Sequence, residues 1–415
     1  MKPIYNLFIK IYPVIAGLIS SKNEKARLWI AGRKNIFQHI ETALKDNKAR
    51  VIWMHCASLG EFEQGRPLLE KIKQEQKESK IFLTFFSPSG YEVRKNYAGA
   101  DWIFYLPMDS AKNARLFFDL VKPTLVLFVK YEFWFYYLKE AKQRNIPLLL
   151  VSGIFRPGQA FFKWYGGFYR NMLQCFTHFF LQTEDAKQLL ANINITGNVS
   201  VSGDTRFDRV LEIAEGFKPL PIIENFITDH QVIVSGSTWS ADDEELDHYA
   251  NTHQEIKFII APHDISEERI KECLRLYKNA ILYSQYSAAP ENNPGKNVLI
   301  IDNIGMLSKL YKYATVTYVG GGFGGDGVHN VLEAAVYHKP VIYGPEYDKF
   351  IEAEDLIESG GGYSIKDALE LEKQLDELML QGDTYKQACE SAGNYVKNNA
   401  GATELIMLYL RKNVF

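Results

Sequence analysis

Short apolar segments recur along this chain, and stretches with charged residues at helical spacing separate them. In the first half these segments are residues 51–54, 81–85, 125–128 and 148–151. Residues 62–76, between the first two segments, carry apolar residues at the three-to-four spacing of a helix. Fully apolar strands that alternate with helices are typical of a parallel sheet covered on both faces. The pattern therefore predicts an α/β fold.

The same pattern starts again in the second half of the chain. Its apolar segments are residues 232–234, 258–260, 298–301, 316–319 and 341–343. The length of 415 residues also exceeds what one hydrophobic core usually supports. Pro219 and Pro221 mark a linker, which we place at residues 206–228. We predict two Rossmann-like, doubly wound domains facing across a cleft, at residues 31–205 and 229–415, with the last helix packing back toward the first domain.

Composition narrows the class of protein further. Hydrophobic residues make up 47% of the chain and charged residues 23%, which excludes wholesale disorder. A formal net charge of -3 argues against a nucleic-acid-binding protein. The four cysteines form no CxxC pair, so we interpret them as reduced thiols rather than disulfides or a zinc site.

The N-terminal segment is apolar and is followed by basic residues. Residues 4–20 are interrupted by Lys10 and Pro13 and are shorter than the roughly 20 residues that span a bilayer. Basic residues within 22–34 favour contact with an anionic cytoplasmic leaflet. We predict that residues 1–30 form a membrane-associated helix that serves as an anchor. The alternative is an amphipathic helix docked on its own domain.

A candidate catalytic turn follows the first predicted strand. In open parallel sheets ligands bind beyond the carboxyl ends of the strands, which for two facing domains places the site in the cleft between them. Residues 55–61 occupy such a position, where Gly60 is expected to allow a tight turn and Glu61 to begin a helix. Glu61 is the candidate base. The alternative is that it only complements the helix dipole.

A second carboxylate closes another strand of the first half. Glu132 follows the segment 125–128 and stands close to Trp134, which suggests a carboxylate in the cleft. The alternative is a salt bridge from Glu132 to Lys130 or Arg156.

Glycines follow the segment 316–319 in the second half. The N–H groups of Gly320, Gly321 and Gly322 are expected to approach a phosphate, and a helix beginning at His329 is expected to add its dipole. Glu333 on that helix is a candidate for binding ribose hydroxyls. The alternative is that the glycines serve packing alone.

Two further strand ends of the second half carry polar residues. Ser237 and Thr238 suit an anion or a sugar, and His263 is either a phosphate contact or a surface histidine. The acidic run 242–245 is interpreted as the solvated start of a helix rather than a metal site. We therefore predict no required metal.

Taken in order, these motifs resemble the 3-deoxy-D-manno-octulosonic acid (Kdo) transferases of lipopolysaccharide biosynthesis. The motifs are Ala31-Gly32-Arg33-Lys34, Ser58-Leu59-Gly60-Glu61, residues 84–90 (TFFSPSG), residues 105–109 (YLPMD), Glu132-Phe133-Trp134, residues 203–208 (GDTRFD), Ser237-Thr238, Gly320-Gly321-Gly322 and residues 329–333 (HNVLE). The chain departs from the family at residues 130–136, where many members read ETELWPN, and at the longer glycine loop GGFGGDGVHN.

The resemblance implies a GT-B glycosyltransferase that needs no cofactor. It implies CMP-Kdo as donor, lipid IVA as acceptor, and attachment to the cytoplasmic face of the inner membrane through anionic lipids. Glu61 matches the family's base. The residues assigned to the acceptor side are Ser58, Gly60, Ser87, Glu132 and Arg156, and those assigned to the donor are Ser237, Thr238, His263, Gly320, Gly321, Gly322, His329, Asn330 and Glu333. The alternatives are a UDP-sugar transferase or epimerase of the same architecture, and a non-catalytic, membrane-tethered nucleotide-binding scaffold.

Overall fold

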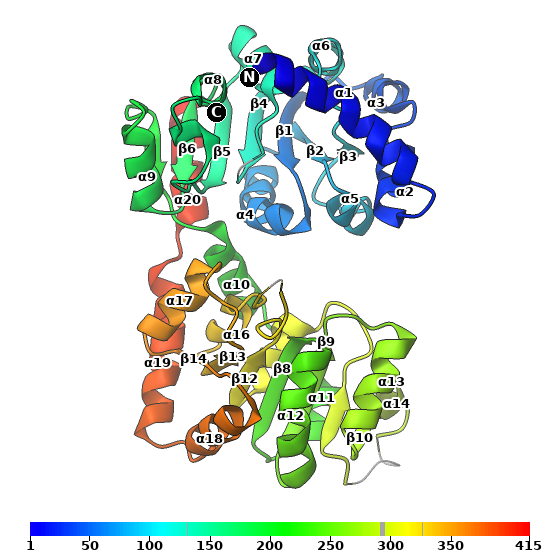
Figure 1. The fold of residues 1–415 in the computed structure, drawn as a ribbon, viewed down its shortest axis with the longest axis vertical. Helices are drawn as coiled ribbons and strands as arrows, with labels where there is room; N and C mark the ends of the chain where they lie inside the picture. Colours follow the sequence, from blue (N-terminus) through cyan, green and yellow to red (C-terminus); the bar gives the residue numbers. More distant parts are fainter. Residues whose placement is uncertain (131, 291–294, 326) are drawn as a thin grey trace. The chain divides into compact units, whose positions relative to one another are not determined.

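The computed structural model spans residues 1–415 and describes all of them except 131, 291–294 and 326. Tyr131 and Asp326, which stand in two of the motifs above, therefore lie outside the described residues. The chain divides into two compact units, one formed by Met1–Arg209 with Ala400–Phe415 and the other by Val210–Asn399. Each unit is built on a seven-stranded parallel sheet (Figure 1). The predicted two-domain α/β fold is confirmed.

The sheet of the first unit has the strand order β3-β2-β1-β4-β5-β6-β7. Its strands are β1 (Arg50–Cys56), β2 (Ser79–Phe85), β3 (Trp102–Tyr105), β4 (Pro123–Val129), β5 (Leu148–Gly153), β6 (His178–Leu181) and β7 (Val199–Val201). The order reverses at β1, where Met54 is in register with Leu83 of β2 and Leu127 of β4. The turns after β1, β2 and β4 therefore lie side by side at one edge of the sheet, which is where such sheets bind ligands.

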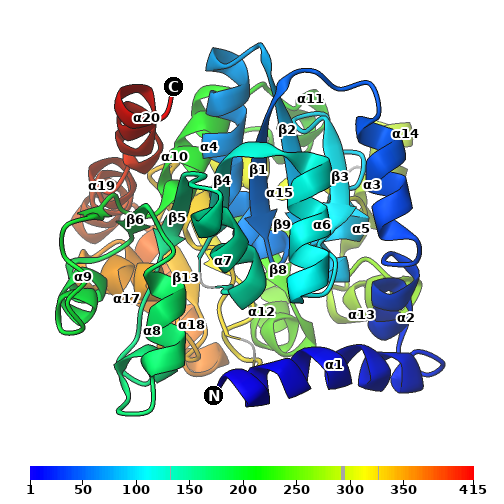
Figure 2. The same ribbon diagram turned by 90° about the horizontal axis from the view of Figure 1, so that it is seen from above.

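Helices cover both faces of this sheet (Figure 2). They are α1 (Lys2–Ile19), α2 (Glu24–Ala31), α3 (Ile36–Leu44), α4 (Leu59–Glu75), α5 (Pro88–Arg94), α6 (Ala111–Val121), α7 (Phe135–Gln143), α8 (Gly167–Leu173), α9 (Glu184–Ala191), α20 (Ala402–Asn413) and the first part of α10 (Thr205–Glu215). Trp53 of β1 packs in a core with α3, α6 and α7, whereas Met54 packs in a second core with α4 and α20. The last helix of the chain is thus part of the first unit.

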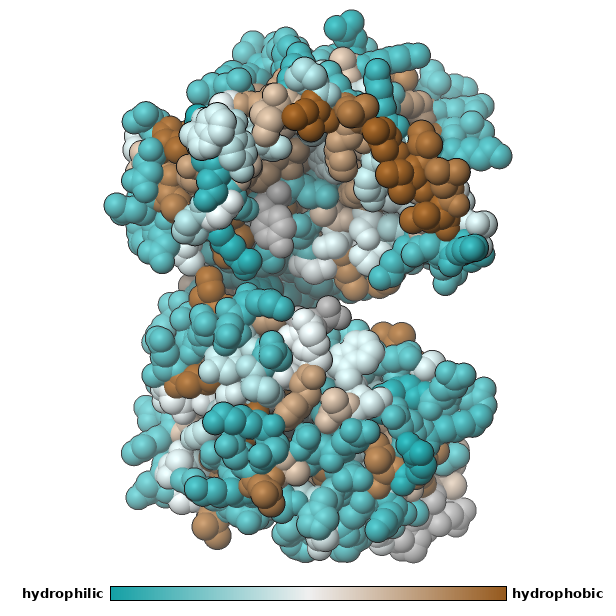
Figure 3. Space-filling view, viewed as in Figure 1, coloured by the Kyte–Doolittle hydropathy of each residue, from teal (hydrophilic) through white to brown (hydrophobic). Residues whose placement is uncertain are grey.

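Helix α1 is docked on the first unit and continues through Pro13. The hydroxyl of Tyr5 donates a 2.5 Å hydrogen bond to Asp109 Oδ2 and accepts one of 3.2 Å from the backbone N–H of Phe135. The outward side of α1 is apolar (Figure 3), and Leu18 is 76% exposed. None of the helices in the described part of the chain is both long enough and apolar enough to cross a membrane.

The sheet of the second unit has the order β10-β11-β9-β8-β12-β13-β14, so β8 lies between β9 and β12. Its strands are β8 (Val232–Thr238), β9 (Lys257–Pro262), β10 (Ala280–Leu282), β11 (Val298–Ile300), β12 (Val316–Val319), β13 (Val341–Tyr343) and β14 (Gly362–Ser364). Its further helices are α11 (Pro221–Ile227), α12 (Ser240–Thr252), α13 (Glu267–Leu276), α14 (Tyr283–Ala288), α15 (Leu307–Leu310), α16 (Leu332–Ala335), α17 (Ile351–Glu358), α18 (Ala368–Met379) and α19 (Asp383–Asn398).

The region 206–228, expected to be a linker, is largely helical. It holds most of α10 and all of α11, with only residues 216–220 between them. Pro221 stands in the first turn of α11, where the missing N–H group costs no helical hydrogen bond. The proline density therefore marked a helix start rather than an extended segment.

Candidate functional site

The turn between β1 and α4 fixes the position of Glu61. The strand ends at Cys56, the helix begins at Leu59, and Glu61 is its third residue. Glu61 Oε2 accepts hydrogen bonds from the backbone N–H of Ala57 and, at 3.2 Å, from that of Ser58. The carboxylate is 6% exposed. Glu61 thus complements the helix start, as the alternative interpretation required, and these bonds also hold its second oxygen in a fixed direction.

The surroundings of Glu61 change its acidity. Burial, followed by the negative charge of Glu132, raises the pKa of Glu61 to about 7, although the hydrogen bond from Ala57 and the charge of Lys130 act in the opposite direction. A general base is most effective when its pKa lies near the working pH. Glu61 therefore has the acidity that a base needs at neutral pH.

Glu132 is held by two donors from different parts of the unit. Its Oε2 accepts hydrogen bonds from Trp134 Nε1 at 2.9 Å and from His55 Nε2 at 2.8 Å. His55 Nδ1 lies 2.9 Å from the hydroxyl of Thr84, which already accepts a 2.8 Å bond from Trp53 Nε1. The hydroxyl proton of Thr84 is thus available to Nδ1, so the ring proton of a neutral His55 belongs on Nε2, facing Glu132. The sequence analysis did not find this role of His55.

The other residues assigned to the acceptor side differ in how the structure places them. The N–H of Ser87 donates a 2.7 Å bond to the carbonyl of Ala57, which joins the β2–α5 turn to the β1–α4 turn. Arg156 is exposed, its backbone N–H donates a 3.1 Å bond to Gln159 Oε1, and its carbonyl accepts a 3.0 Å bond from the N–H of Gln159. The described residues include no ion pair between Arg156 and Glu132, so this half of the alternative is not formed, and a salt bridge from Glu132 to Lys130 stays a prediction.

Gly60 does not make a tight turn, so this expectation is wrong. It lies in the first turn of α4 and is exposed, and it is not among the described glycines with positive φ. A Cβ built on Gly60 would meet no atom within 4 Å. Neither backbone conformation nor packing within the described residues therefore requires glycine here, and open space remains beside Glu61.

In the second unit Asp242 ties two predicted donor-binding segments together. Its carboxylate accepts hydrogen bonds from the N–H of Trp239 at 2.8 Å, the N–H of Gly321 at 2.9 Å and the hydroxyl of Tyr318 at 2.8 Å. The turn after β8 and the loop after β12 are thereby held in fixed positions. Asp242 is only 1% exposed.

The interpretation of residues 242–245 as a solvated helix start is therefore wrong for the first two of them. Asp243 is fully buried, accepts a 2.9 Å bond from the hydroxyl of Tyr277 and pairs with Arg269. Both carboxylates turn inward at the start of α12, where partners distant in sequence satisfy them.

The glycines after β12 are packed against backbone. A Cβ on Gly320 would lie 2.5 Å from the carbonyl of Ser237, and one on Gly322 would lie 2.6 Å from the nitrogen of Gly344. The N–H of Gly320 donates to Gly236, and that of Gly321 donates to Asp242. The expected phosphate contact through these two N–H groups is thus wrong for this arrangement, and the contact through Gly322 stays a prediction.

Aromatic rings gather at the same edge of the second sheet. Trp239 stacks on His263 with ring centres 4.6 Å apart, and His263 stacks on His329 at 4.4 Å. The structure thus brings both predicted histidines together and adds Trp239, which the sequence analysis missed. Ser237 is partly exposed, whereas Thr238 is fully buried, and their donor contacts stay predictions.

The segment after the glycine loop differs from the expected helix. Helix α16 begins at Leu332 rather than at His329 and is only four residues long. Asn330 Nδ2 donates a 3.1 Å bond to Glu333 Oε1, so these two predicted donor contacts are neighbours. The expected helix dipole at His329 is absent, and the ribose contact of Glu333 stays a prediction.

The fold and the matches to known proteins define the class. Solved structures with a similar fold include a UDP-N-acetylglucosamine 2-epimerase from Listeria monocytogenes (TM-score 0.61, 14% identity, 88% of this chain and 96% of that chain). Another is a glycosyltransferase from Rickettsia africae (TM-score 0.56, 17% identity, 88% of this chain and 99% of that chain). The chain is a two-domain α/β protein of the GT-B fold.

Sequence relatives give the particular family. Residues 32–209 match the family model described as 3-deoxy-D-manno-octulosonic-acid transferase (kdotransferase). The chain is 28% identical to a 3-deoxy-D-manno-octulosonic acid transferase of Aquifex aeolicus, over 81% of this chain and 88% of that protein. It is 24% identical to a 3-deoxy-D-manno-octulosonic acid transferase of Haemophilus influenzae, over 96% of this chain and 95% of that protein. These matches support a Kdo transferase, as the motifs indicated.

One relative is much longer. A bifunctional glycosyltransferase/methyltransferase of Fusobacterium nucleatum is 26% identical over 86% of this chain, and the match spans 56% of that protein. The chain thus corresponds to little more than half of that relative.

Proposed function

We propose that this protein transfers Kdo from CMP-Kdo to a hydroxyl of lipid IVA, with inversion at the anomeric carbon and without a metal. Similarity to Kdo transferases supports Kdo as the transferred sugar. The observation that carries the mechanism is Glu61, a fixed and buried carboxylate at the carboxyl edge of β1 whose pKa is about 7.

The chemistry requires a base on one face of the sugar. The anomeric carbon of Kdo carries a carboxylate group, and its bond to the phosphate of CMP breaks with both electrons leaving on CMP. The acceptor oxygen forms the new bond from the opposite face and loses its proton to the carboxylate of Glu61. Ser237 and the rings of His263 and His329 are the candidates for stabilising the phosphate as it leaves.

Glu132 has a supporting role in this scheme. Its carboxylate is turned toward His55 and Trp134, which occupy Oε2. Its charge raises the pKa of Glu61. We therefore assign Glu132 as a positioning and electrostatic residue and Glu61 as the base.

Substrate tests decide between the proposed function and its alternatives. Purified protein is incubated with lipid IVA and either CMP-Kdo or UDP-N-acetylglucosamine, in excess chelator, and product is followed by mass spectrometry. Kdo addition by the wild type and its loss in Glu61→Gln are expected. Turnover with the UDP-sugar alone would establish the alternative enzyme, and binding of nucleotide without turnover of either donor would establish a scaffold.

We also propose that α1 rests on the cytoplasmic face of the inner membrane. The support is its outward apolar side, where Leu7, Val14 and Leu18 are 57%, 62% and 76% exposed. Because Tyr5 ties α1 to Asp109, substitution is a cleaner test than deletion. Replacing these three residues by Ser is expected to release protein from membranes while keeping activity in detergent. Unchanged membrane retention would contradict the proposal.

A further inference from the structure

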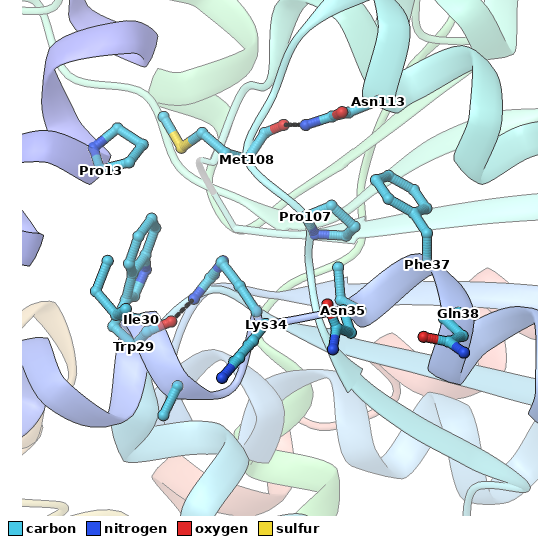
Figure 4. A pocket seen from close by; sticks show the side chains of 13 residues that line it. Pro13, Trp29, Ile30, Lys34, Asn35, Phe37, Gln38, Pro107, Met108 and Asn113 are labelled. Carbon is cyan, nitrogen blue, oxygen red and sulfur yellow. Dashed lines mark hydrogen bonds between the residues drawn. The ribbon is translucent and has the colours of Figure 1, made fainter.

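Cavities adjoin helix α1 along much of its length. One of about 540 Å³ lies between α1, α2, α3 and the segment before α6, where Pro13, Trp29, Phe37 and Met108 border it (Figure 4). Another of about 400 Å³ adjoins the first half of α1. Helix α1 therefore meets its unit at separated points and leaves space between them.

A third cavity leads from α1 toward the candidate base, and we call it the α1–α2 groove. Its volume is about 330 Å³, within the range of about 300–1,000 Å³ typical of small-molecule sites. Its apolar walls include Tyr12, Ile15 and Ile19 of α1, Ala26 and Trp29 of α2, and Phe86 after β2. A lining of this kind suits a flexible hydrocarbon chain.

One end of the α1–α2 groove reaches the β1–α4 turn. Ser87 lines the groove, and its N–H donates a 2.7 Å bond to the carbonyl of Ala57. The N–H of Ala57 in turn donates to Glu61. Two hydrogen-bonded residues, Ser87 and Ala57, thus connect the groove to Glu61.

The border of the α1–α2 groove is cationic. Lys25 lines it, and none of its lining residues is a carboxylate. Arg33 does not line the groove, but its guanidinium stacks on two wall residues, 4.0 Å from the ring centre of Trp29 and 4.9 Å from that of Phe86. It donates hydrogen bonds to the backbone carbonyls of Leu106, Trp29 and Phe86. An apolar groove with Lys25 at its border and this guanidinium against its wall favours an anionic amphiphile.

A wall residue also has an unsatisfied polar group. Trp29 is 5% exposed, and its Nε1 has no hydrogen-bond partner among the described residues. Buried donors are seldom left unpaired, because the lost hydration is costly. The indole N–H of Trp29 is therefore an unpaired donor in the wall of the groove.

We propose that the α1–α2 groove binds one acyl chain of the acceptor glycolipid and so directs the acceptor sugar toward Glu61. This inference rests on the proposed function, because it concerns the acceptor of that reaction. It assigns to α1 a contact with substrate in addition to its contact with the membrane.

Two matched double variants of α1 test the proposal in detergent. Ile15→Ser with Ile19→Ser removes groove walls that are 51% and 48% exposed, whereas Val14→Ser with Leu18→Ser removes residues that are 62% and 76% exposed and do not line the groove. The groove variant is expected to raise KM for lipid IVA at least tenfold, with KM for CMP-Kdo and for a deacylated acceptor unchanged. The control is expected to match the wild type. Equal effects of both variants would overturn the proposal.

A binding measurement separates failure of this inference from failure of the proposed function, because it needs no turnover. The probe is a single-chain lysophospholipid with a brominated acyl chain, used below its micelle concentration, which quenches nearby tryptophan. Quenching is expected in the wild type and in the Val14/Leu18 control, and is expected to be lost in Trp29→Phe and weakened in the Ile15/Ile19 variant. Each methylene removed from the chain should weaken binding about fourfold, from about 0.8 kcal/mol per buried methylene. Quenching that is insensitive to both Trp29→Phe and chain length would overturn the inference even if Kdo transfer is observed.

Discussion

Replacing Glu61 by Gln separates its function as a base from its function at the helix start. Gln keeps the size of the side chain, and its amide oxygen still accepts from the N–H groups of Ala57 and Ser58. It cannot take a proton from an acceptor hydroxyl. General-base assistance contributes about 10²–10⁴-fold, so turnover should fall by that factor while CMP-Kdo binding is retained.

The same substitution should stabilise the protein at high pH. The pKa of Glu61 rises from its ordinary 4.5 to about 7 in the folded state, so folding disfavours the charged form. A carboxyl group with a raised pKa does not destabilise the fold below its unfolded pKa; its cost grows as pH rises from the unfolded to the folded pKa and is complete above the folded pKa. At about 1.4 kcal/mol per unit, Glu61→Gln should gain at most roughly 3 kcal/mol at pH 8 and almost nothing at pH 4.

Two measurements check this reasoning. Urea unfolding of both proteins at pH 4 and pH 8 gives the difference in stability, and CMP release gives the rate, which in the wild type should rise with pH through about 7. Glu63→Gln, two residues further along α4, is the control for loss of a carboxylate near the start of the helix, and it also removes ion pairs with Arg94 and Arg66. Near-wild-type turnover of a folded Glu61→Gln protein, or a stability difference independent of pH, would refute the assignment.

Further predictions concern the neighbours of Glu61, the donor loops and metals. Glu132→Gln removes a charge that raises the pKa of Glu61, so the pH profile of kcat/KM should move to lower pH; an unmoved profile would contradict this coupling. Gly60→Ala should stabilise α4 by about 0.5–1 kcal/mol yet raise KM for the acceptor several-fold, because the new methyl group enters open space beside Glu61; unchanged acceptor kinetics would argue against substrate at this position. Asp242→Asn should lower the free energy of unfolding by about 1–3 kcal/mol and raise KM for the donor rather than for the acceptor, since Asp242 holds both loops after β8 and β12. An equal rise in KM for both substrates would contradict this role of Asp242. Activity should persist in excess chelator, and a loss restored by magnesium would contradict metal independence.

Much of the fold could be predicted because each central strand is marked in the sequence by a short run of consecutive apolar residues. All nine apolar segments named from the sequence coincide with strands β1, β2, β4, β5, β8, β9, β11, β12 and β13. Strands such as β3, β10 and β14 were missed. They lie at the sheet edges and are only partly buried, whereas β11 and β13 are equally short but are fully buried within the sheet.

The candidate site was predicted only in part, because its partners are distant in sequence. Glu61 could be placed at a helix start from its position after a strand, but its pKa depends on burial and on Glu132. The bond from His55 to Glu132 joins residues 77 positions apart. Such contacts arise from strand order, which local patterns do not encode.

The sequence by itself determined the two parallel sheets, the strand ends that carry polar residues and the resemblance to the Kdo transferases, because periodicity and motifs are local properties of the chain. Only the tertiary structure decided which carboxylates are buried. The composition of the acidic run that begins at Asp242 suggests a solvated segment, yet Asp242 is hydrogen-bonded to Gly321 and Tyr318 because β8 and β12 are neighbours in the sheet. Likewise α1 reads as a free anchor until the bond from Tyr5 to Asp109 docks it on the first unit. Burial and pairing depend on packing between distant segments, and packing sets both the acidity of Glu61 and the groove beside it.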